Sequence, residues 1–175
     1  MQRVRRGVST LEILATLTVL GAVATAAFSG FRTYLQGSEA DGLAGEVASD
    51  LQFIRTEAVS RNEAVRLSFG TLPGGGSCYV IHTGPQDACT CGSAGPAVCS
   101  GAISIKTVRI ASPGRVHLAA NVPSILYDPR HGTASPAGSV SITTSDGRTV
   151  RHVVSLMGRV RTCSPEGALR GYRPC

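Results

Sequence analysis

The chain contains no tryptophan, and aromatic residues make up only 5% of its 175 residues. Proteins that hold single-stranded nucleic acid by stacking its bases need exposed aromatic rings. The composition therefore disfavours base stacking as the main mode of binding. Lysine is also scarce, because Lys106 is the one lysine among 17 basic residues. The others are arginines, whose guanidinium groups match phosphate oxygens in pairs.

Sequence signatures of common enzymes are missing too. There is no Gly-x-Ser-x-Gly elbow, no His-Glu-x-x-His pair and no glycine-rich loop ending in Lys-Ser or Lys-Thr. The four histidines are scattered, and His152, beside Arg151 in an expected strand, suits a structural or phosphate-facing role better than that of a catalytic base. We therefore expect no enzyme activity, no cofactor and no metal.

Charge is missing from one long apolar run. Residues 13–31, 19 in number, contain no charged side chain. A helix of that length covers about 28 Å, close to the thickness of a bilayer core. Arg3, Arg5 and Arg6 precede the run, which predicts a cytoplasmic N-terminus and a C-terminal part beyond the inner membrane.

A cleaved secretory signal is the alternative interpretation of this run, with the small residues 24–26 as its cleavage site. Glu12 argues against it. A carboxylate weakens the insertion of an apolar segment, and such a residue usually marks function when it persists in a membrane span.

The residues around this carboxylate resemble a known leader. Gly7-Val8-Ser-Thr-Leu-Glu12, followed by an apolar helix, resembles the start of a type IV prepilin. The resemblance implies that a prepilin peptidase cuts between Gly7 and Val8, so that Glu12 becomes the fifth residue of the mature chain. In that family this glutamate meets the N-terminal ammonium of a neighbouring subunit, and a carboxylate in a low-dielectric setting needs such a partner. The new N-terminal residue is methylated in pilins, and here it is Val8 in place of the usual phenylalanine.

After the apolar run, the pattern predicts one helix and then strands. Residues 38–61 should form an amphipathic helix, because apolar residues recur there at helical spacing. Its expected buried face consists of Leu43, Val47, Leu51, Ile54 and Ala58. The opposite face carries Glu46, Asp50, Arg55 and Glu57, interpreted as solvated charges. Strands are expected at 65–69, 78–83, 103–110, 115–119 and 124–127, with a hairpin of 140–144 and 148–156 that turns at Asp146-Gly147.

These elements predict an α+β fold of the type IV pilin kind, with a long N-terminal helix packed on a C-terminal antiparallel β-sheet domain. The expected segments are a leader at 1–7, a transmembrane helix at 8–31, an amphipathic helix at 32–62 and a periplasmic β-rich domain at 63–175.

Six cysteines suit an oxidising compartment such as the periplasm, and their even number allows complete pairing. A bridge between Cys89 and Cys91 is sterically poor. We therefore expect Cys163 to pair with Cys175, and two further bridges among Cys78, Cys89, Cys91 and Cys99. Zinc binding is the alternative, but no histidine has the required spacing and the compartment favours oxidation.

Basic charge gathers in the C-terminal part. Residues 8–102 carry four basic and eight acidic side chains, a net charge of −4, whereas residues 103–175 carry ten basic and three acidic ones, a net charge of +7. Such an asymmetry indicates a polyanionic partner. Within this part, Gly158-Arg159-Val160-Arg161 places two arginines two residues apart. In a strand both would project from one face about 7 Å apart, near the spacing of successive phosphates on one nucleic-acid strand.

Nearly the whole chain resembles the GspH/FimT family of minor pilins and pseudopilins. The resemblance rests on the helix-to-strand junction at 51–67, on YDPRHGTA at 127–134 and on the C-terminal stretch 138–161. In the FimT branch, a Gly-Arg-x-Arg motif binds DNA during natural transformation. This implies that Gly158, Arg159 and Arg161 bind double-stranded DNA, with Arg148, Arg151, Arg170 and Arg173 as surrounding charges.

The expected function is thus that of a minor pilin that captures DNA without sequence preference, and its partners are other pilin subunits, the prepilin peptidase and the inner membrane. A GspH-like pseudopilin of a type II secretion system, or an assembly-priming minor pilin that does not bind DNA, is the alternative. Glu12 and the apolar run fit both, and only the basic face separates them.

Overall fold

In the computed structural model, residues 9–73, 75–93, 95–111, 114–165, 169 and 171–175 are described. The chain divides into two compact units, Met1–Leu35 and Gln36–Cys175. One helix, α1, runs from Thr10 to Arg61 and belongs to both. The cleavage site Gly7-Val8 and Arg170 lie outside the described residues.

The start of α1 is capped by its own sequence. Ser9 Oγ accepts a hydrogen bond from the backbone N–H of Leu11 at 3.3 Å, which makes Ser9 the N-cap. Glu12 lies in the first turn, where a carboxylate is favoured by the positive end of the helix dipole. Further along, the hydroxyls of Thr16, Thr18 and Thr25 donate to backbone carbonyls three residues back. The N-terminal part of α1 is therefore long and apolar enough to cross a membrane, and these threonines keep their polar atoms satisfied within it.

The second part of α1 supplies one side of the protein core. Val47, Leu51, Ile54 and Ala58 are buried, as the periodicity predicts, whereas Leu43 is only half-buried. Ala40 and Ala44 extend the buried stripe toward the N-terminus. Small side chains at these two positions let the helix backbone approach the sheets closely.

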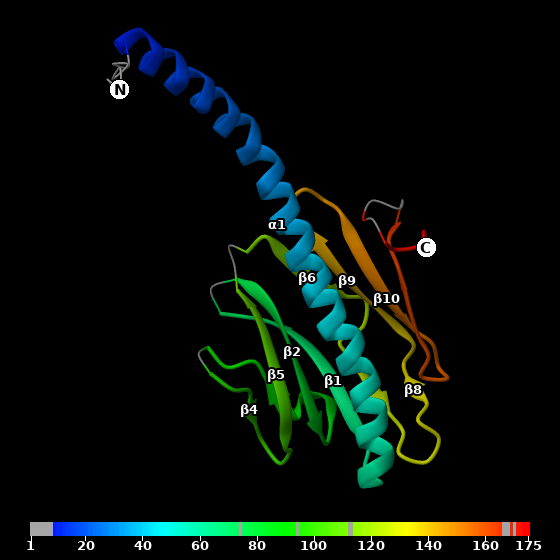
Figure 1. Cartoon of the computed structure of the whole chain (residues 1–175). Coiled ribbons are helices and arrows are strands. Elements are labelled where there is room, and N and C mark those ends of the chain that lie inside the picture. The colour runs from blue at the N-terminus through cyan, green and yellow to red at the C-terminus, as the bar shows by residue number, and fades with distance from the viewer. Residues whose placement is uncertain (1–8, 74, 94, 112–113, 166–168, 170) are drawn as a thin grey trace, which may run out of the picture. The chain divides into compact units, whose positions relative to one another are not determined.

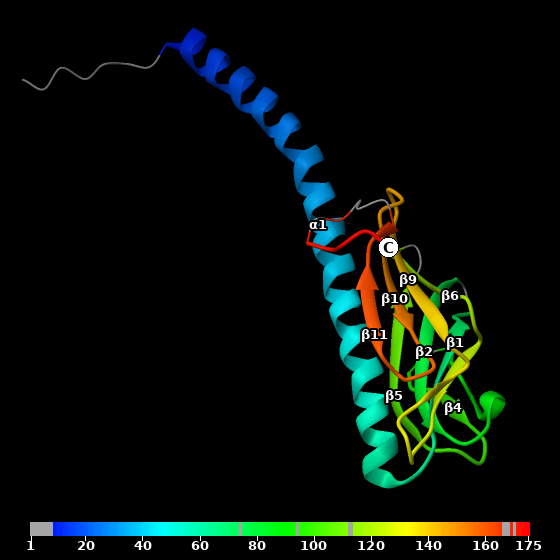
Figure 2. The same ribbon diagram turned by 90° about the vertical axis from the view of Figure 1, so that its right-hand side faces the viewer.

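Two antiparallel sheets and a short ribbon complete the fold (Figures 1 and 2). The first sheet has the order β5-β2-β1-β7-β8 and the second has the order β11-β10-β9-β6, while β3 pairs with β4. The strands of the first sheet are β1 (Val65–Thr71), β2 (Gly76–Thr83), β5 (Ser104–Ala111), β7 (Ser124–Tyr127) and β8 (Ala134–Ser135). Those of the second are β6 (Val116–Ala120), β9 (Gly138–Thr144), β10 (Thr149–Val154) and β11 (Val160–Cys163). The ribbon consists of β3 (Cys89–Thr90) and β4 (Val98–Cys99), and a short 3-10 helix, η1 (Gln86–Ala88), precedes it.

The expected α+β architecture is confirmed. From Gln36 on, α1 lies across both sheets, and side chains of both belong to one core that includes Tyr79 and Ile81 of β2 and Val140 and Ile142 of β9 (Figure 1). The expected strands match observed ones to within a few residues, but the short strands β3, β4 and β8 were not anticipated, and β11 was considered only as a possible strand for the Gly-Arg-x-Arg motif. Strands of two residues are too short to show a periodicity in the sequence.

All six cysteines are paired, as expected. The bridges are Cys78–Cys91, Cys89–Cys99 and Cys163–Cys175. The first fastens the segment after β3 to β2, and the second joins β3 to β4 within the ribbon. The third ties the C-terminal end of the chain to the last residue of β11.

The interpretation of Asp50 as a solvated charge is wrong. This residue is only 6% exposed, and its carboxylate accepts a hydrogen bond from Tyr79 Oη at 2.7 Å and two from Lys106 Nζ at 2.7 and 2.8 Å. Burial, together with the neighbouring Asp50, raises the pKa of Tyr79 far above its usual value. Burial alone would lower the pKa of Lys106, but its hydrogen bonds to Asp50 and Glu46 outweigh that effect and raise it. A carboxylate on α1 thus links the helix to β2 and β5.

We expect Asp50→Ala to lower the free energy of unfolding by about 2 kcal/mol, because it leaves the buried Tyr79 hydroxyl without its acceptor and leaves Lys106 with only the exposed Glu46. Urea unfolding of residues 36–175 measures the change. Glu46→Ala is the control, since Glu46 pairs with the same Lys106 Nζ but is largely exposed, and it should cost less than about 0.5 kcal/mol. Equal effects in the two variants would contradict the proposed link.

Two histidines, His82 and His152, are buried. His82 Nδ1 lies 2.7 Å from the carbonyl oxygen of Thr83, and His152 Nδ1 lies 2.9 Å from Thr162 Oγ1. Burial lowers the pKa of both rings. The burial of His152 also excludes the phosphate-facing role considered for it, and leaves the structural one.

Because the folded-state pKa values lie below the unfolded value, the stabilisation by these neutral rings is complete above about pH 6.5 and is lost as the pH falls below it. We expect the free energy of unfolding of residues 36–175 to decrease between pH 7 and pH 5. His152→Gln should make this pH dependence shallower, whereas His117→Gln, at an exposed position, should not. A His152→Gln profile parallel to the wild type would refute the assignment.

Candidate nucleic-acid interface

The Gly-Arg-x-Arg motif lies at the start of an edge strand. β11 pairs with β10 alone, with Val154 opposite Val160, Val153 opposite Arg161 and Arg151 opposite Cys163. The ladder continues by one more residue, since Ser155 N donates to Arg159 O at 3.0 Å. Figure 2 shows β11 and β10 side by side.

This register puts the arginines on one face of the hairpin. Residues opposite each other in an antiparallel pair share a face, and so do residues two apart in a strand. Arg151, Arg159 and Arg161 therefore project from the same side as the partly exposed Val153, whereas His152 and Val154 point into the core. Arg159 and Arg161 are exposed, and Arg151 is half-buried with its Nε 3.3 Å from Ser141 Oγ.

The C-terminal disulfide adds one more arginine to this face. The Cys163–Cys175 bridge returns the tail to β11, where Ser164 N donates to Arg173 O at 2.8 Å. Arg161 and Arg173 then line one groove of about 430 Å³. Its other lining residues are Val153, Thr162, Cys163, Pro174 and Cys175.

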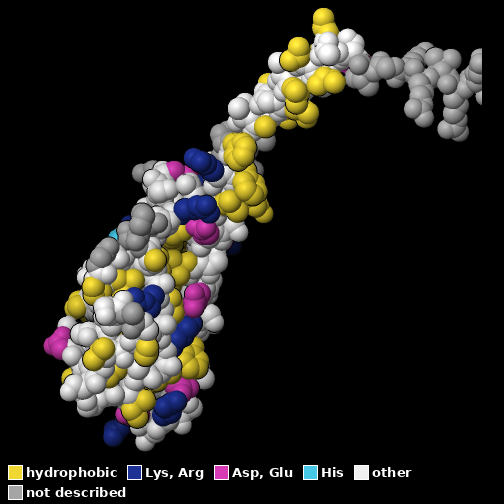
Figure 3. Space-filling model, turned by 90° about the vertical axis from the view of Figure 1, so that its left-hand side faces the viewer, with side chains coloured by type: hydrophobic (Ala, Val, Ile, Leu, Met, Phe, Trp, Pro, Cys, Tyr) yellow, Lys and Arg dark blue, Asp and Glu magenta, His cyan; other side chains and the backbone are white. Residues whose placement is uncertain are grey.

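Electrostatics single out three of these side chains. Arg159, Arg161 and Arg173 form no ion pair with any residue in the described part of the chain. Of the other described basic residues, Arg61, Lys106, Arg115 and Arg148 contact carboxylates, as in the 2.8 Å contact between Arg115 and Glu39. Others, such as Arg55 and Arg66, have no ion pair among the described residues either, so what distinguishes Arg159, Arg161 and Arg173 is that they gather on one face. On the side of the molecule shown in Figure 3, basic and acidic side chains are interleaved. The unpaired guanidinium groups of the β10–β11 face are therefore free to bind an external anion.

Arg148, expected to add charge beside the motif, lies elsewhere. It stands in the turn before β10, at the opposite end of that strand from Arg159. Arg148 Nε contacts Asp146 Oδ2 at 2.9 Å, and its guanidinium group lies beside Gly37 of α1. The structure thus does not bring Arg148 together with Arg159 and Arg161, and Arg170 is not among the described residues.

Arg55 was assigned to the solvated face of the helix, but it lies next to the motif. A Cβ atom built on Gly158 would stand 3.5 Å from Arg55 Nε, and one built on Gly132 would stand 2.8 Å from it. The position of Arg55 in the sequence carries no sign of this, because its neighbours come from loops more than 75 residues later. Only the packing of α1 against the second sheet reveals the proximity.

Gly158 has a backbone conformation and a close neighbour that both require glycine. Its φ is +70°, and a Cβ at this position would collide with the carbonyl oxygen of Gly132. The loop before β8 therefore presses directly on the β10–β11 turn, and Ala134 N donates to Leu156 O at 2.9 Å. This packed turn comes directly before Arg159 and β11.

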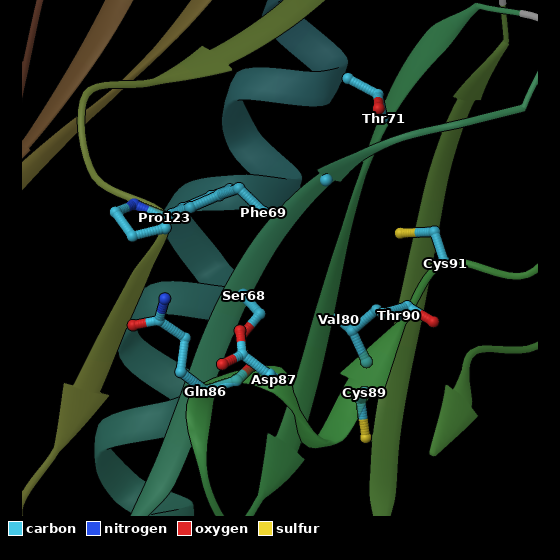
Figure 4. Close-up of a pocket in the computed structure, with 11 residues that line it drawn as sticks. Ser68, Phe69, Thr71, Val80, Gln86, Asp87, Cys89, Thr90, Cys91 and Pro123 are labelled. Atoms are coloured by element: carbon cyan, nitrogen blue, oxygen red, sulfur yellow. The ribbon is translucent and has the colours of Figure 1, made fainter. Parts of the chain in front are cut away.

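A second pocket lies on the first sheet, away from this face. It has a volume of about 260 Å³, and Figure 4 shows Ser68, Gln86 and Asp87 at one side of it and Thr90 and Cys91 at the other. Ser68 Oγ lies 2.8 Å from Nε2 of the buried His82 and 3.3 Å from the carbonyl oxygen of Gln86. These contacts fasten η1 to β1 and β2, which is a structural role.

We expect Gly158→Ala to lower the free energy of unfolding of residues 36–175 by about 3 kcal/mol, because it combines an unfavourable φ with a backbone collision. Gly147→Ala is a matched control. Gly147 has a φ of +89° in the β9–β10 turn, but nothing lies within 4 Å of an added Cβ. It should therefore cost only about 1 kcal/mol. Equal costs in urea unfolding would contradict the close approach to Gly132.

Comparisons with known proteins agree with this architecture. The sequence model of the family described as "Type II transport protein GspH" matches residues 43–158. The chain is 31% identical to the pilin-like protein PilA1 of Thermus thermophilus over 160 residues, which cover 90% of this chain and 97% of that protein. The type IV minor pilin FimU of Pseudomonas aeruginosa has a similar fold, with a TM-score of 0.51 and 18% identity over 74% of this chain and 94% of FimU. Because the family model covers more than half of the chain and the Thermus relative covers nine tenths of it, the chain belongs to the GspH family of minor pilins and pseudopilins.

Proposed function

We propose that this minor pilin binds duplex DNA without sequence preference, through the basic face formed by Arg159, Arg161 and Arg173 with Arg151 beside them. The observation that supports the proposal most strongly is the exposure of three guanidinium groups on one face, none of them in an ion pair with a described residue. Cleavage after Gly7 would leave a net charge of +3, the sum of −4 over residues 8–102 and +7 over residues 103–175, so the positive charge lies in the part that carries this face and attracts a polyanion. The family model ends at Gly158, so the two arginines of the motif lie beyond the part it matches.

The chemistry of the face favours phosphate contacts over the reading of bases. Arginine forks bind phosphate oxygens, and such contacts position a protein on DNA without specifying a sequence. The affinity should be modest and should fall steeply with salt, because each phosphate that is neutralised releases counterions. An uptake filament that must accept any DNA during natural transformation needs this kind of binding, and several copies in one filament would raise the avidity.

The N-terminal part suits delivery to the membrane before assembly. We propose that a prepilin peptidase cuts between Gly7 and Val8, that residues 8–31 span the inner membrane and that residues 32–175 face the periplasm. As a member of a pilin family, the chain assembles with other pilin subunits. In the proposed filament Glu12 pairs with the N-terminal ammonium of a neighbouring subunit, which satisfies a carboxylate in an apolar segment.

A secretion pseudopilin is the second candidate function, because the matching family takes its description from type II transport. In that role α1 and its membrane segment have the same task as in a pilin. The basic face then packs against acidic surfaces of neighbouring subunits. Binding to DNA separates the two candidates.

We expect Arg159→Ala/Arg161→Ala to weaken binding to duplex DNA and to reduce the slope of log K against log salt by about two units, one for each phosphate that is no longer neutralised. The measurement is a fluorescence-anisotropy titration of the full chain in nonionic micelles, with duplexes of unrelated sequence at several salt concentrations.

Arg61→Ala/Arg115→Ala removes the same charge from exposed ion pairs outside the basic face and should leave the slope nearly unchanged. A wild-type chain that does not bind DNA at low salt would refute DNA capture and favour the pseudopilin.

A further inference from the structure

The tip of the β10–β11 turn exposes two large apolar side chains. Leu156 is 58% exposed and Met157 is 67% exposed. They occupy the two central positions of a turn in which Gly158 N donates to Ser155 O at 2.8 Å. Such positions normally carry glycine, proline, asparagine, aspartate or serine. An apolar pair at a turn tip therefore calls for an explanation beyond the turn itself.

The neighbouring hairpin shows that the turn geometry does not require this pair. In the β9–β10 turn, Gly147 N donates to Thr144 O, and Thr144 N donates to Arg148 O, both at 2.9 Å. The β10–β11 turn has the same pattern between Ser155 and Arg159, and the third loop residue of each turn is a glycine of positive φ. Both are three-residue loops of the same kind. The first has Ser145-Asp146 where the second has Leu156-Met157, so polar residues satisfy this geometry equally well.

The apolar tip is held in place by the backbone around it. Leu156 O accepts a hydrogen bond from Ala134 N, and Gly158 packs against the carbonyl of Gly132. The tip therefore cannot fold back to bury Leu156 and Met157 without breaking these contacts. It presents two exposed side chains from a backbone that is already ordered, so binding does not have to order the backbone of the turn.

Charge indicates what covers the tip. Arg159 follows the turn directly, and Arg55 Nε of α1 lies 3.5 Å from where a Cβ on Gly158 would stand. Leucine and methionine side chains next to positive charges are complementary to DNA, which offers phosphates at the rim of a groove and apolar base faces inside it. Proteins that insert such apolar wedges between base steps partly unstack the bases and bend the duplex.

We propose that Leu156 and Met157 form an apolar wedge that enters a base step of the bound duplex while Arg159 and Arg55 hold the flanking phosphates. This inference rests on the proposed DNA binding and deepens it. Phosphate contacts weaken as the salt concentration rises, whereas the wedge contributes an affinity that does not depend on counterion release. The two contributions can therefore be measured separately.

The test compares the full chain in nonionic micelles with a Leu156→Ser/Met157→Asn variant. Serine and asparagine suit the turn and leave the net charge unchanged. We expect the variant to bind duplex DNA about tenfold more weakly at every salt concentration, with an unchanged salt slope. Wild-type protein should raise the fluorescence of 2-aminopurine placed within the duplex, because unstacking relieves its quenching, and the variant should not.

Val98→Ser/Ile103→Ser is the matched control. It removes two similarly exposed apolar side chains from the region around β4 and β5 and should alter neither readout. If the wild type binds with the expected salt slope but the Leu156→Ser/Met157→Asn variant binds equally well, the wedge proposal is refuted and the proposal of phosphate contacts is retained. If the variant changes only self-association in sedimentation velocity, the tip is a contact between copies and the wedge is likewise refuted. A wild-type chain that does not bind DNA refutes both proposals.

Discussion

One buried stripe of α1 holds two separate sheets in a single domain. Ala40, Ala44, Val47, Leu51, Ile54 and Ala58 face a core to which both sheets contribute. Direct bonds between the sheets include the hydrogen bond that Ser77 Oγ accepts from Leu118 N at 3.1 Å. Since burial of apolar surface is the dominant favourable term in folding, the relative position of the sheets depends on this stripe. Asp50 reinforces it by linking the helix to Tyr79 and Lys106.

The basic face is a consequence of that arrangement. The second sheet turns His152 and Val154 toward α1, and the alternation of a strand then sends Arg151 and Val153 outward. In β11, which pairs with β10, Arg161 stands opposite Val153 and projects outward from the same face. Packing of the loop at Gly132 against Gly158 places Arg55 beside the turn. The packing of the interior thus decides which side chains project outward and form the charged surface.

Some arginines are neutralised by carboxylates within the protein, and others are not. Arg61, Arg115 and Arg148 contact nearby carboxylates, so much of their charge is neutralised within the protein. Arg159, Arg161 and Arg173 have no such contact within the described residues. Other described arginines, such as Arg55, Arg66 and Arg109, also have no ion pair among the described residues, so it is the gathering of Arg159, Arg161 and Arg173 on one face that distinguishes this surface.

The sequence by itself determined the elements whose causes are local. Helical spacing predicted the buried stripe, alternation predicted the longer strands, and Asp146-Gly147 predicted the β9–β10 turn, because these patterns depend on residues close together in the chain. It also limited the possible disulfide pairings to a small set, and it identified Arg159 and Arg161 as candidate DNA-binding residues. Only the tertiary structure decided which of the cysteines at 78, 89, 91 and 99 are joined, that Asp50 is buried, that Arg148 lies apart and that Arg55 lies beside Gly158. These outcomes depend on which distant segments pack together, and such contacts leave no period or spacing in the sequence.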